Sequence, residues 1–170
     1  MASSLQLQSL LSIAFLLLLS QAAAVSSLNT KSLSISREFF STADGVIIDV
    51  QKTAQRETLP QNNGPGKNKK QPLLFIHGSC HSSWCFDEIY VPHMASLGHT
   101  CYAVNLRGTK RSPVSSREKK SVKIEEHVAD LFIVIESINA AHDSRPVVLS
   151  HSFGGLISMK MMENDRIRSG

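Results

Sequence analysis

The spacing of apolar residues changes several times along the chain, and each spacing predicts a different element. A continuous apolar run at 73–76 has the length of a strand that is buried on both faces, and the mostly apolar stretch at 101–106 predicts another strand. Between 124 and 140 the apolar residues recur every three or four positions, which predicts an amphipathic helix. A third apolar run at 147–149 leads through a turn of small residues into a helical pattern from 156 onward. This alternation predicts an α/β fold with a mainly parallel sheet and helices on both faces.

The first part of the chain adds an antiparallel pair to this sheet. An Asp-Gly pair at 44–45 stands between two apolar runs, which predicts a β-hairpin. Residues 58–71 are rich in Pro, Gly, Asn and Lys and predict a solvated loop. Apolar positions between 84 and 96 indicate one helix, which Pro92 would break or kink. In the later helix we expect His127 to lie at the surface.

The N-terminal residues read as a separate segment. Residues 10–19 are apolar over the length of a signal-peptide core, and small residues suited to cleavage end at Ala24. This run is too short to span a bilayer comfortably, so we expect no stable membrane span after its removal. No basic residue precedes the run and no acidic residue occurs before Glu38, which leaves a plastid transit peptide as the alternative. We therefore expect a signal peptide at 1–24, a flexible tail at 25–37, and a secretory or extracellular location.

Composition excludes several classes of function. With 170 residues, of which 42% are hydrophobic, the chain is long enough for one globular domain and too short for two. The net charge is only +4, and the aromatic residues do not interleave with basic ones, so we expect no nucleic-acid binding. The sequence has no zinc-ligand spacing, and we expect neither a metal nor a cofactor. The three cysteines, Cys80, Cys85 and Cys101, are either free thiols, which we favour, or include one bridged pair.

The candidate chemistry lies in the turn around Ser152. A serine at the tip of a sharp strand-to-helix turn is exposed and strained, and its neighbours two residues away must be small because they crowd together. Ser150 and Gly154 meet that condition. The following helix would direct its N-terminal N–H groups and its dipole at the serine, which favours the negative oxygen of acyl transfer. We therefore expect Ser152 to be a nucleophile; the alternative is a plain turn that contains a serine.

Two motifs resemble those of the α/β-hydrolase superfamily and follow the same order along the chain. The turn around Ser152 resembles the nucleophile elbow, small-x-Ser-x-Gly, with Ser150 where the family usually has glycine. His77-Gly78-Ser79 resembles the His-Gly-x turn that follows the third strand of that fold. The resemblance implies that the backbone N–H groups of Ser79 and Phe153 form the oxyanion hole. It also implies that His77 and Gly78 support the turn and that His77 is not the base.

The resemblance also sets the expected domain and its closer relatives. It implies a partial α/β-hydrolase domain at 38–170, with the fold truncated after the nucleophile-elbow helix. The stretch His-Gly-x-x-His-x-x-Trp is similar to that of the plant methylesterase and hydroxynitrile-lyase branch. A further family turn, Asp-x-Arg-Gly-x-Gly-x-Ser, is matched in part, because Asn105 replaces its aspartate and Lys110 its second glycine. These replacements make the geometry of that turn an open question.

The rest of the expected catalytic triad is missing from the sequence. In this fold the order is Ser, then Asp or Glu, then His, and no histidine follows Ser152 here. The elbow strand, which is central in the family, would become an exposed edge through which the chain could pair. One hypothesis is an incomplete hydrolase that acts on a small-molecule ester or thioester; a lyase or acyltransferase at the same site stays open. The other is a catalytically inactive, truncated hydrolase-like protein that acts as a binding module.

Overall fold

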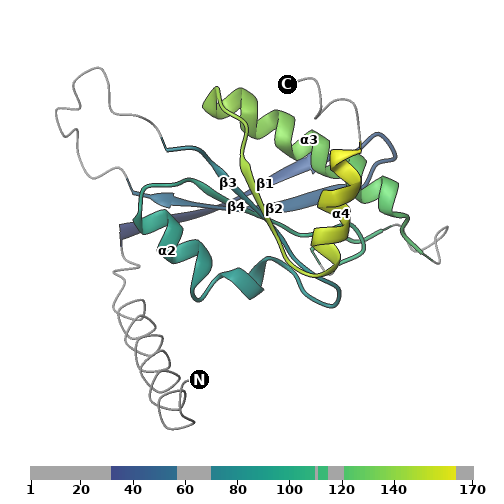
Figure 1. The fold of residues 1–170 in the computed structure, drawn as a ribbon, viewed down its shortest axis with the longest axis horizontal. Helices are drawn as coiled ribbons and strands as arrows, with labels where there is room; N and C mark the ends of the chain where they lie inside the picture. The colour runs from purple at the N-terminus through teal and green to yellow at the C-terminus, as the bar shows by residue number, and fades with distance from the viewer. Residues whose placement is uncertain (1–31, 57–69, 110, 115–120, 164–170) are drawn as a thin grey trace, which may run out of the picture.

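The computed structural model of the protein describes residues 32–56, 70–109, 111–114 and 121–163. The expected signal peptide at 1–24 and most of the expected loop at 58–71 lie outside the described residues. In chain order the elements are β1 (Leu33–Ser41), β2 (Ile47–Gln55), β3 (Leu73–Ile76), the 3₁₀ helix η2 (Ser83–Phe86), α2 (Tyr90–Ser96), β4 (Cys101–Val104), α3 (Ile124–His142), β5 (Val147–Ser150) and α4 (Phe153–Met162) (Figure 1).

The five strands form one sheet in the order β1-β2-β4-β3-β5. β2 pairs antiparallel with both β1 and β4, whereas β3 pairs parallel with both β4 and β5. Four of the five described strands therefore run in one direction, which confirms the predicted mainly parallel sheet. β5 lies at one edge, where Val147 and Val148 are 44% and 37% exposed. The exposed edge was expected; pairing through it stays a prediction.

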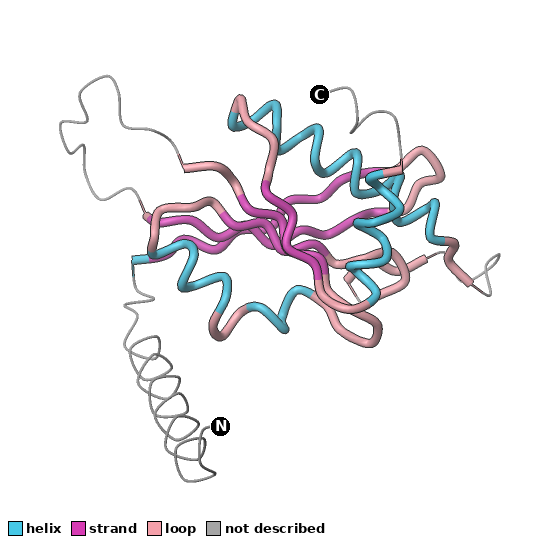
Figure 2. The backbone as a smooth tube through the Cα atoms, in the orientation of Figure 1, coloured by secondary structure: helices cyan, strands magenta, loops and turns pink. Residues whose placement is uncertain are grey.

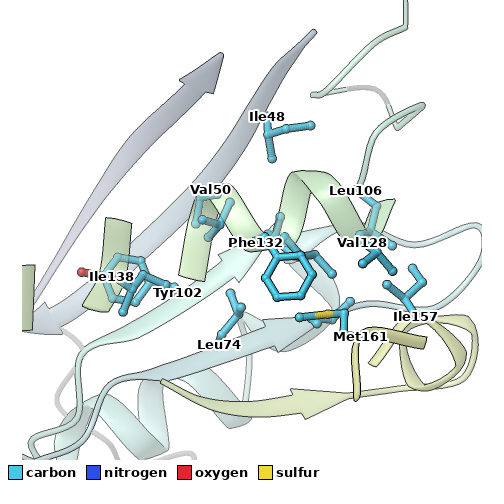
Figure 3. Packing of buried hydrophobic residues seen from close by; sticks show 14 of the residues in the cluster. Ile48, Val50, Leu74, Tyr102, Leu106, Val128, Phe132, Ile138, Ile157 and Met161 are labelled. Carbon is cyan, nitrogen blue, oxygen red and sulfur yellow. The ribbon is translucent and has the colours of Figure 1, made fainter. Parts of the chain in front are cut away.

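Helices cover both faces of the sheet, with α2 on one side and α3 and α4 on the other (Figure 2). Successive side chains of a strand point to opposite faces, so β3 and β4 need apolar residues at every position. Leu74 and Tyr102 pack with Phe132 and Met161 on the side of α3 and α4 (Figure 3). Phe75 and its neighbours pack against η2 and α2 on the other side. Each large side chain buried in this way stabilises the fold by roughly 1.5–3 kcal/mol.

The hairpin forms where the Asp-Gly pair predicts it, with Ser41 opposite Ile47 in register. Gly45 has a φ of 82°, which a side chain would disfavour, and the Val46 N–H donates to Thr42 Oγ1 at 2.9 Å. β1 begins earlier than expected, because Leu33 pairs with Gln55. The tail expected at 25–37 is therefore wrong for residues 33–37. Serines had suggested a loop, but backbone pairing at a sheet edge does not need apolar side chains.

The expected helix at 84–96 is split into η2 and α2. Pro92 lies in the first turn of α2, where backbone N–H groups have no intrahelical partner, so the ring removes no hydrogen bond. The helix expected at 124–140 is confirmed as α3. Glu126 stabilises its first turn by accepting a hydrogen bond from the Lys123 N–H at 2.8 Å. Over the described part of the chain, no helix is both long enough and apolar enough to cross a membrane.

Candidate active site

Ser152 lies at the tip of the turn between β5 and α4. Its φ of 53° and ψ of −120° are disfavoured for any residue with a Cβ and cost on the order of 1–3 kcal/mol. The turn is held by the His151 N–H, which donates to the Ile76 carbonyl at 3.0 Å, and by the Gly154 N–H, which donates to the His151 carbonyl at 3.0 Å. The expected tight and strained strand-to-helix turn is therefore present, and the serine side chain stands at its apex.

Gly154 brings the start of α4 against the end of β3. A Cβ on Gly154 would lie 2.6 Å from the Ile76 carbonyl oxygen and 2.7 Å from that of His77. These distances are too short for any side chain, and both oxygens belong to backbone that cannot easily move. Ser150, at the other side of the turn, is exposed at the end of β5. The requirement for a small residue is thus strict at Gly154.

His77 is fixed by hydrogen bonds from both ring nitrogens. The Leu106 N–H donates to His77 Nε2 at 3.1 Å, so that nitrogen accepts. The ring proton then lies on Nδ1 and is donated to the Gly78 carbonyl at 2.7 Å. Burial lowers the pKa of His77 and keeps the ring neutral. His77 therefore has no free nitrogen with which to act as a base, and it ties the His-Gly turn to the end of β4.

Gly78 and Ser79 lie beside the elbow. A Cβ on Gly78 would lie 2.9 Å from the Ser152 Cβ, so the two turns touch. Ser79 and Phe153 line the same pocket of about 160 Å³. Among the described residues, nothing accepts a hydrogen bond from the N–H of either Ser79 or Phe153, whereas the N–H groups of Gly154 and Gly155 are bonded. Both N–H groups are thus unpaired within the described part of the chain, as the donors of an oxyanion hole must be.

The described residues do not supply a base for Ser152. Their histidine hydrogen bonds go to backbone groups and to Tyr102, and none reaches Ser152. His151 is adjacent in sequence, but its ring faces His81 at a centroid distance of 6.2 Å. His81 in turn interacts with the Ser79 carbonyl at 2.8 Å and stacks on Trp84. These side chains form part of the surface around the turn rather than a relay to the serine.

Arg107 anchors the turn after β4 in a buried ion-pair cluster. Its guanidinium donates two hydrogen bonds to Asp130 of α3, at 2.8 and 2.6 Å, and also binds Asp44 of the hairpin turn. Glu126 Oε1 lies 3.7 Å away. The hydrogen bond from Arg107 holds the pKa of Asp44 well below its usual range. The Arg-Gly motif is visible in the sequence, but the acidic partners of Arg107 are not, because they lie 63 and 23 residues away.

Asn105 occupies the position where the family motif has aspartate, and its side-chain amide both donates and accepts a hydrogen bond. Nδ2 donates to Asp49 Oδ2 at 3.0 Å, and Oδ1 accepts from the Ser83 N–H at 2.8 Å. A carboxylate at this buried position could not donate to Asp49. The turn that follows is closed by the Gly108 N–H, which donates to the Ser112 carbonyl at 2.8 Å, and Gly108 has a φ of 85°. Lys110 lies outside the described residues.

His127 is buried, and the expectation that it lies at the surface is wrong. It is 5% exposed and contacts the Phe153 ring edge-on at a centroid distance of 5.6 Å. The sequence did carry a signal, because His127 stands four residues before Leu131 and so shares its face of α3. The helix face toward the elbow therefore contains an imidazole as well as the apolar side chains.

The cysteines and the possible metal ligands were also located in the structure. All three cysteines are free thiols, which confirms the favoured alternative, and burial raises the pKa of Cys101 to about 12. Within the described ranges, no three His, Cys, Asp or Glu side chains are grouped so that they could hold a metal ion.

Comparison with known proteins shows which family the chain resembles. The profile of the family described as serine aminopeptidase, S33, matches residues 67–168. Methylesterase 4 of Arabidopsis thaliana is 27% identical over 90 residues, which cover 53% of this chain and 33% of that protein. Methylesterase 2 of the same plant is 30% identical over 90 residues with the same coverage. The chain thus spans about a third of the length of the curated relatives that it matches.

A solved structure shares the fold at lower identity. An α/β hydrolase from Novosphingobium aromaticivorans superposes with a TM-score of 0.58 at 18% sequence identity, over 76% of this chain and 39% of that one. At this identity the likeness shows the fold alone. The match of the family profile over residues 67–168 shows the family as well. The chain belongs to the serine aminopeptidase S33 family of the α/β-hydrolase superfamily.

Proposed function

We propose that the protein cleaves a carboxylic ester or thioester with Ser152 as the nucleophile. The observation that carries this proposal is the strained serine at the elbow tip, with two free backbone donors beside it. Strain of this kind persists only where the surrounding structure enforces it, and it is typical of functional sites. A turn that merely connected β5 to α4 would not need a serine in a conformation that glycine adopts more readily.

The proposed reaction is acyl transfer through a covalent intermediate. Ser152 Oγ attacks the carbonyl carbon and gives its proton to a general base, while the carbonyl π-electrons move to oxygen. The N–H groups of Ser79 and Phe153 stabilise that oxyanion, and each donor of this kind contributes on the order of 3–4 kcal/mol to the transition state. The tetrahedral intermediate collapses, and the alcohol or thiol leaves with a proton. Water then hydrolyses the acyl-serine and restores the hydroxyl.

The ester class is supported by the relatives rather than by the fold. The named plant relatives are methylesterases, whereas the family description names an aminopeptidase and the superfamily includes an epoxide hydrolase from Vigna radiata. Since a fold hosts several chemistries, the substrate class must follow from the site and its relatives. We therefore propose a small ester-like substrate. The general base is left unassigned, because no histidine of the sequence follows Ser152.

A second candidate function is that of a binding module without turnover. The observation in its favour is that, among the described residues, no histidine ring is seen to hydrogen-bond to Ser152. A serine without a base is a poor nucleophile. The same elbow and pocket could then bind an ester or acid without cleaving it.

Labelling with a fluorophosphonate probe separates the two candidates. The protein is isolated from its source, and its intact mass is compared with the 18.7 kDa of the 170-residue chain. The wild type and Ser150→Ala should be labelled, and Ser152→Ala should not, because only Ser152 lies at the apex of the elbow. Ser150→Ala is the matched control, since it removes an exposed hydroxyl two residues away. A folded but unlabelled wild type would exclude the hydrolase and leave the binding module.

A further inference from the structure

A pocket of about 160 Å³ adjoins the two proposed oxyanion donors. Ser79 and Phe153 form its wall toward the elbow, and Arg107, Thr109 and His127 line other parts of it. A cavity of this size accommodates a group about as large as a benzene ring, so several non-hydrogen atoms of a ligand fit. Because Ser79 and Phe153 line it, a ligand in this pocket lies next to the position proposed for the carbonyl oxygen.

Two of the side chains that line the pocket carry buried polar atoms without partners. Within the described part of the chain, His127 Nδ1 and Thr109 Oγ1 have no hydrogen-bond partner. Native structures leave few buried polar atoms unsatisfied, because each one loses its hydrogen bonds to water without replacement. Two such atoms in residues that line one pocket indicate a place where a ligand supplies the missing hydrogen bonds.

The pocket suits a neutral group rather than a charged one. The Arg107 guanidinium is occupied by Asp44 and Asp130, so its charge is already balanced. Burial lowers the pKa of His127 and keeps its imidazole neutral near pH 7. A neutral imidazole nitrogen and a threonine hydroxyl can each bond to a hydroxyl group, which both donates and accepts.

We propose that this pocket binds a hydroxyl group on the acyl part of the ester substrate, through His127 Nδ1 and Thr109 Oγ1. The inference rests on the proposed function, because it takes the N–H groups of Ser79 and Phe153 as the site of the ester carbonyl. The substrate class is thereby narrowed to small, uncharged hydroxy esters. The edge-on contact with the Phe153 ring restricts the orientation of the His127 ring, so the hydroxyl group would bind to an imidazole nitrogen of defined position.

Two esters that differ in one group test the proposal. Methyl lactate carries a hydroxyl where methyl isobutyrate carries a methyl group of similar size. Their dissociation constants are measured on the full chain by NMR, with the ring ¹⁵N signals of His127 as the reporter. The wild type should bind methyl lactate about 3–10-fold more tightly than methyl isobutyrate, since one hydrogen bond changes affinity by about that factor. The Nδ1 signal should shift with methyl lactate and not with methyl isobutyrate.

Two variants test which side chains distinguish methyl lactate from methyl isobutyrate. For these variants the affinities are measured from backbone amide signals. His127→Phe keeps an aromatic ring and Thr109→Val keeps the shape of the side chain, and each should bring the affinity ratio toward 1. If His127→Phe fails to fold, Thr109→Val decides the outcome. Equal binding of the two esters by the wild type, or a ratio that persists in the folded variants, would overturn the proposal.

The outcome is separable from that of the proposed function. Binding of methyl lactate does not require Ser152 Oγ, so Ser152→Ala should discriminate between the esters as the wild type does. Discrimination in a protein that the fluorophosphonate does not label would retain the hydroxyl pocket and exclude the hydrolase. Labelling without discrimination would retain the hydrolase and exclude the hydroxyl pocket.

Discussion

Gly78 lies directly against Ser152, so that a Cβ on Gly78 would stand 2.9 Å from the Cβ of Ser152. The same Cβ would lie 3.1 Å from His151 Nδ1 and 3.2 Å from the His151 carbonyl oxygen. The two turns that carry the proposed nucleophile and one proposed oxyanion donor are therefore in contact through a glycine. Their separation depends on the absence of a side chain at this position.

Gly78→Ala should separate the two turns and impair the site more than the fold. We expect the rate of fluorophosphonate labelling at Ser152 to fall about 10–100-fold, because a displacement near 1 Å costs about that much in positioning. The free energy of unfolding should fall by about 1–3 kcal/mol, as for other overpacked positions. Labelling kinetics and urea denaturation measure the two effects. A variant that is labelled at the wild-type rate would contradict the proposed geometry.

Neighbouring glycines at the start of α4 should respond in opposite ways to alanine. Gly154→Ala places a methyl group 2.6 Å from a backbone oxygen, and we expect it to lower the free energy of unfolding by about 3 kcal/mol or to prevent folding. Gly155→Ala meets nothing within 4 Å, and alanine favours the helix by about 0.5–1 kcal/mol over glycine. Thermal and urea denaturation should therefore show one loss and one gain. Similar losses of unfolding free energy in both variants would contradict the expected difference between the crowded Gly154 and the open Gly155.

Removal of the Asp130 carboxylate should lower the free energy of unfolding, because the buried Arg107 guanidinium then loses a charged partner. Asp130→Ala takes two hydrogen bonds from Arg107, which is 6% exposed, and breaking a buried pair typically costs about 3–5 kcal/mol. The matched control is Glu125→Ala, which removes an exposed carboxylate from the first turn of the same helix. That change should cost less than about 1 kcal/mol. Equal losses in urea denaturation would show that the cluster contributes no more than surface charge.

The Asp44 carboxylate should make part of the stability depend on pH. Hydrogen bonding to Arg107 lowers the pKa of Asp44 in the folded protein, so its contribution is present above the unfolded pKa, near 4, and is lost as the pH falls below it. Its side chain is 47% exposed, and we expect Asp44→Asn to cost less than about 1 kcal/mol at pH 7. The difference from wild type should shrink between pH 4 and pH 2.5 in urea denaturation. A difference that is constant with pH would contradict the ion pair.

Local patterns were sufficient to predict most of the fold. The strand at 73–76, the hairpin around 44–45, the helix from 124 and the strand-turn-helix around Ser152 all carry their signal within a few residues. Each of these signals reflects burial on one or both faces, or a backbone conformation that particular residues favour. The shape of the candidate site was predictable for the same reason, because both motifs are short and continuous.

Features that depend on distant contacts were not predictable. The pairing of residues 33–37 with β2 follows from backbone hydrogen bonds that serine side chains do not reveal. The burial of His127 depends on the contact with Phe153, and the partners of Arg107 lie far away in sequence. The pocket next to Ser79 and Phe153 combines residues from several separate segments, so no local spacing indicates it.

The long sequence separations around Arg107 have a consequence for the kinetics of folding. Its hydrogen bonds join the hairpin turn, the turn after β4 and α3, across 63 and 23 residues. The complete cluster forms only when all three segments have docked, so we expect it to form late in folding because long-range contacts follow loop closure. Interactions that form after the transition state slow unfolding without accelerating folding. The cluster should therefore lengthen the lifetime of the folded protein more than it hastens its formation.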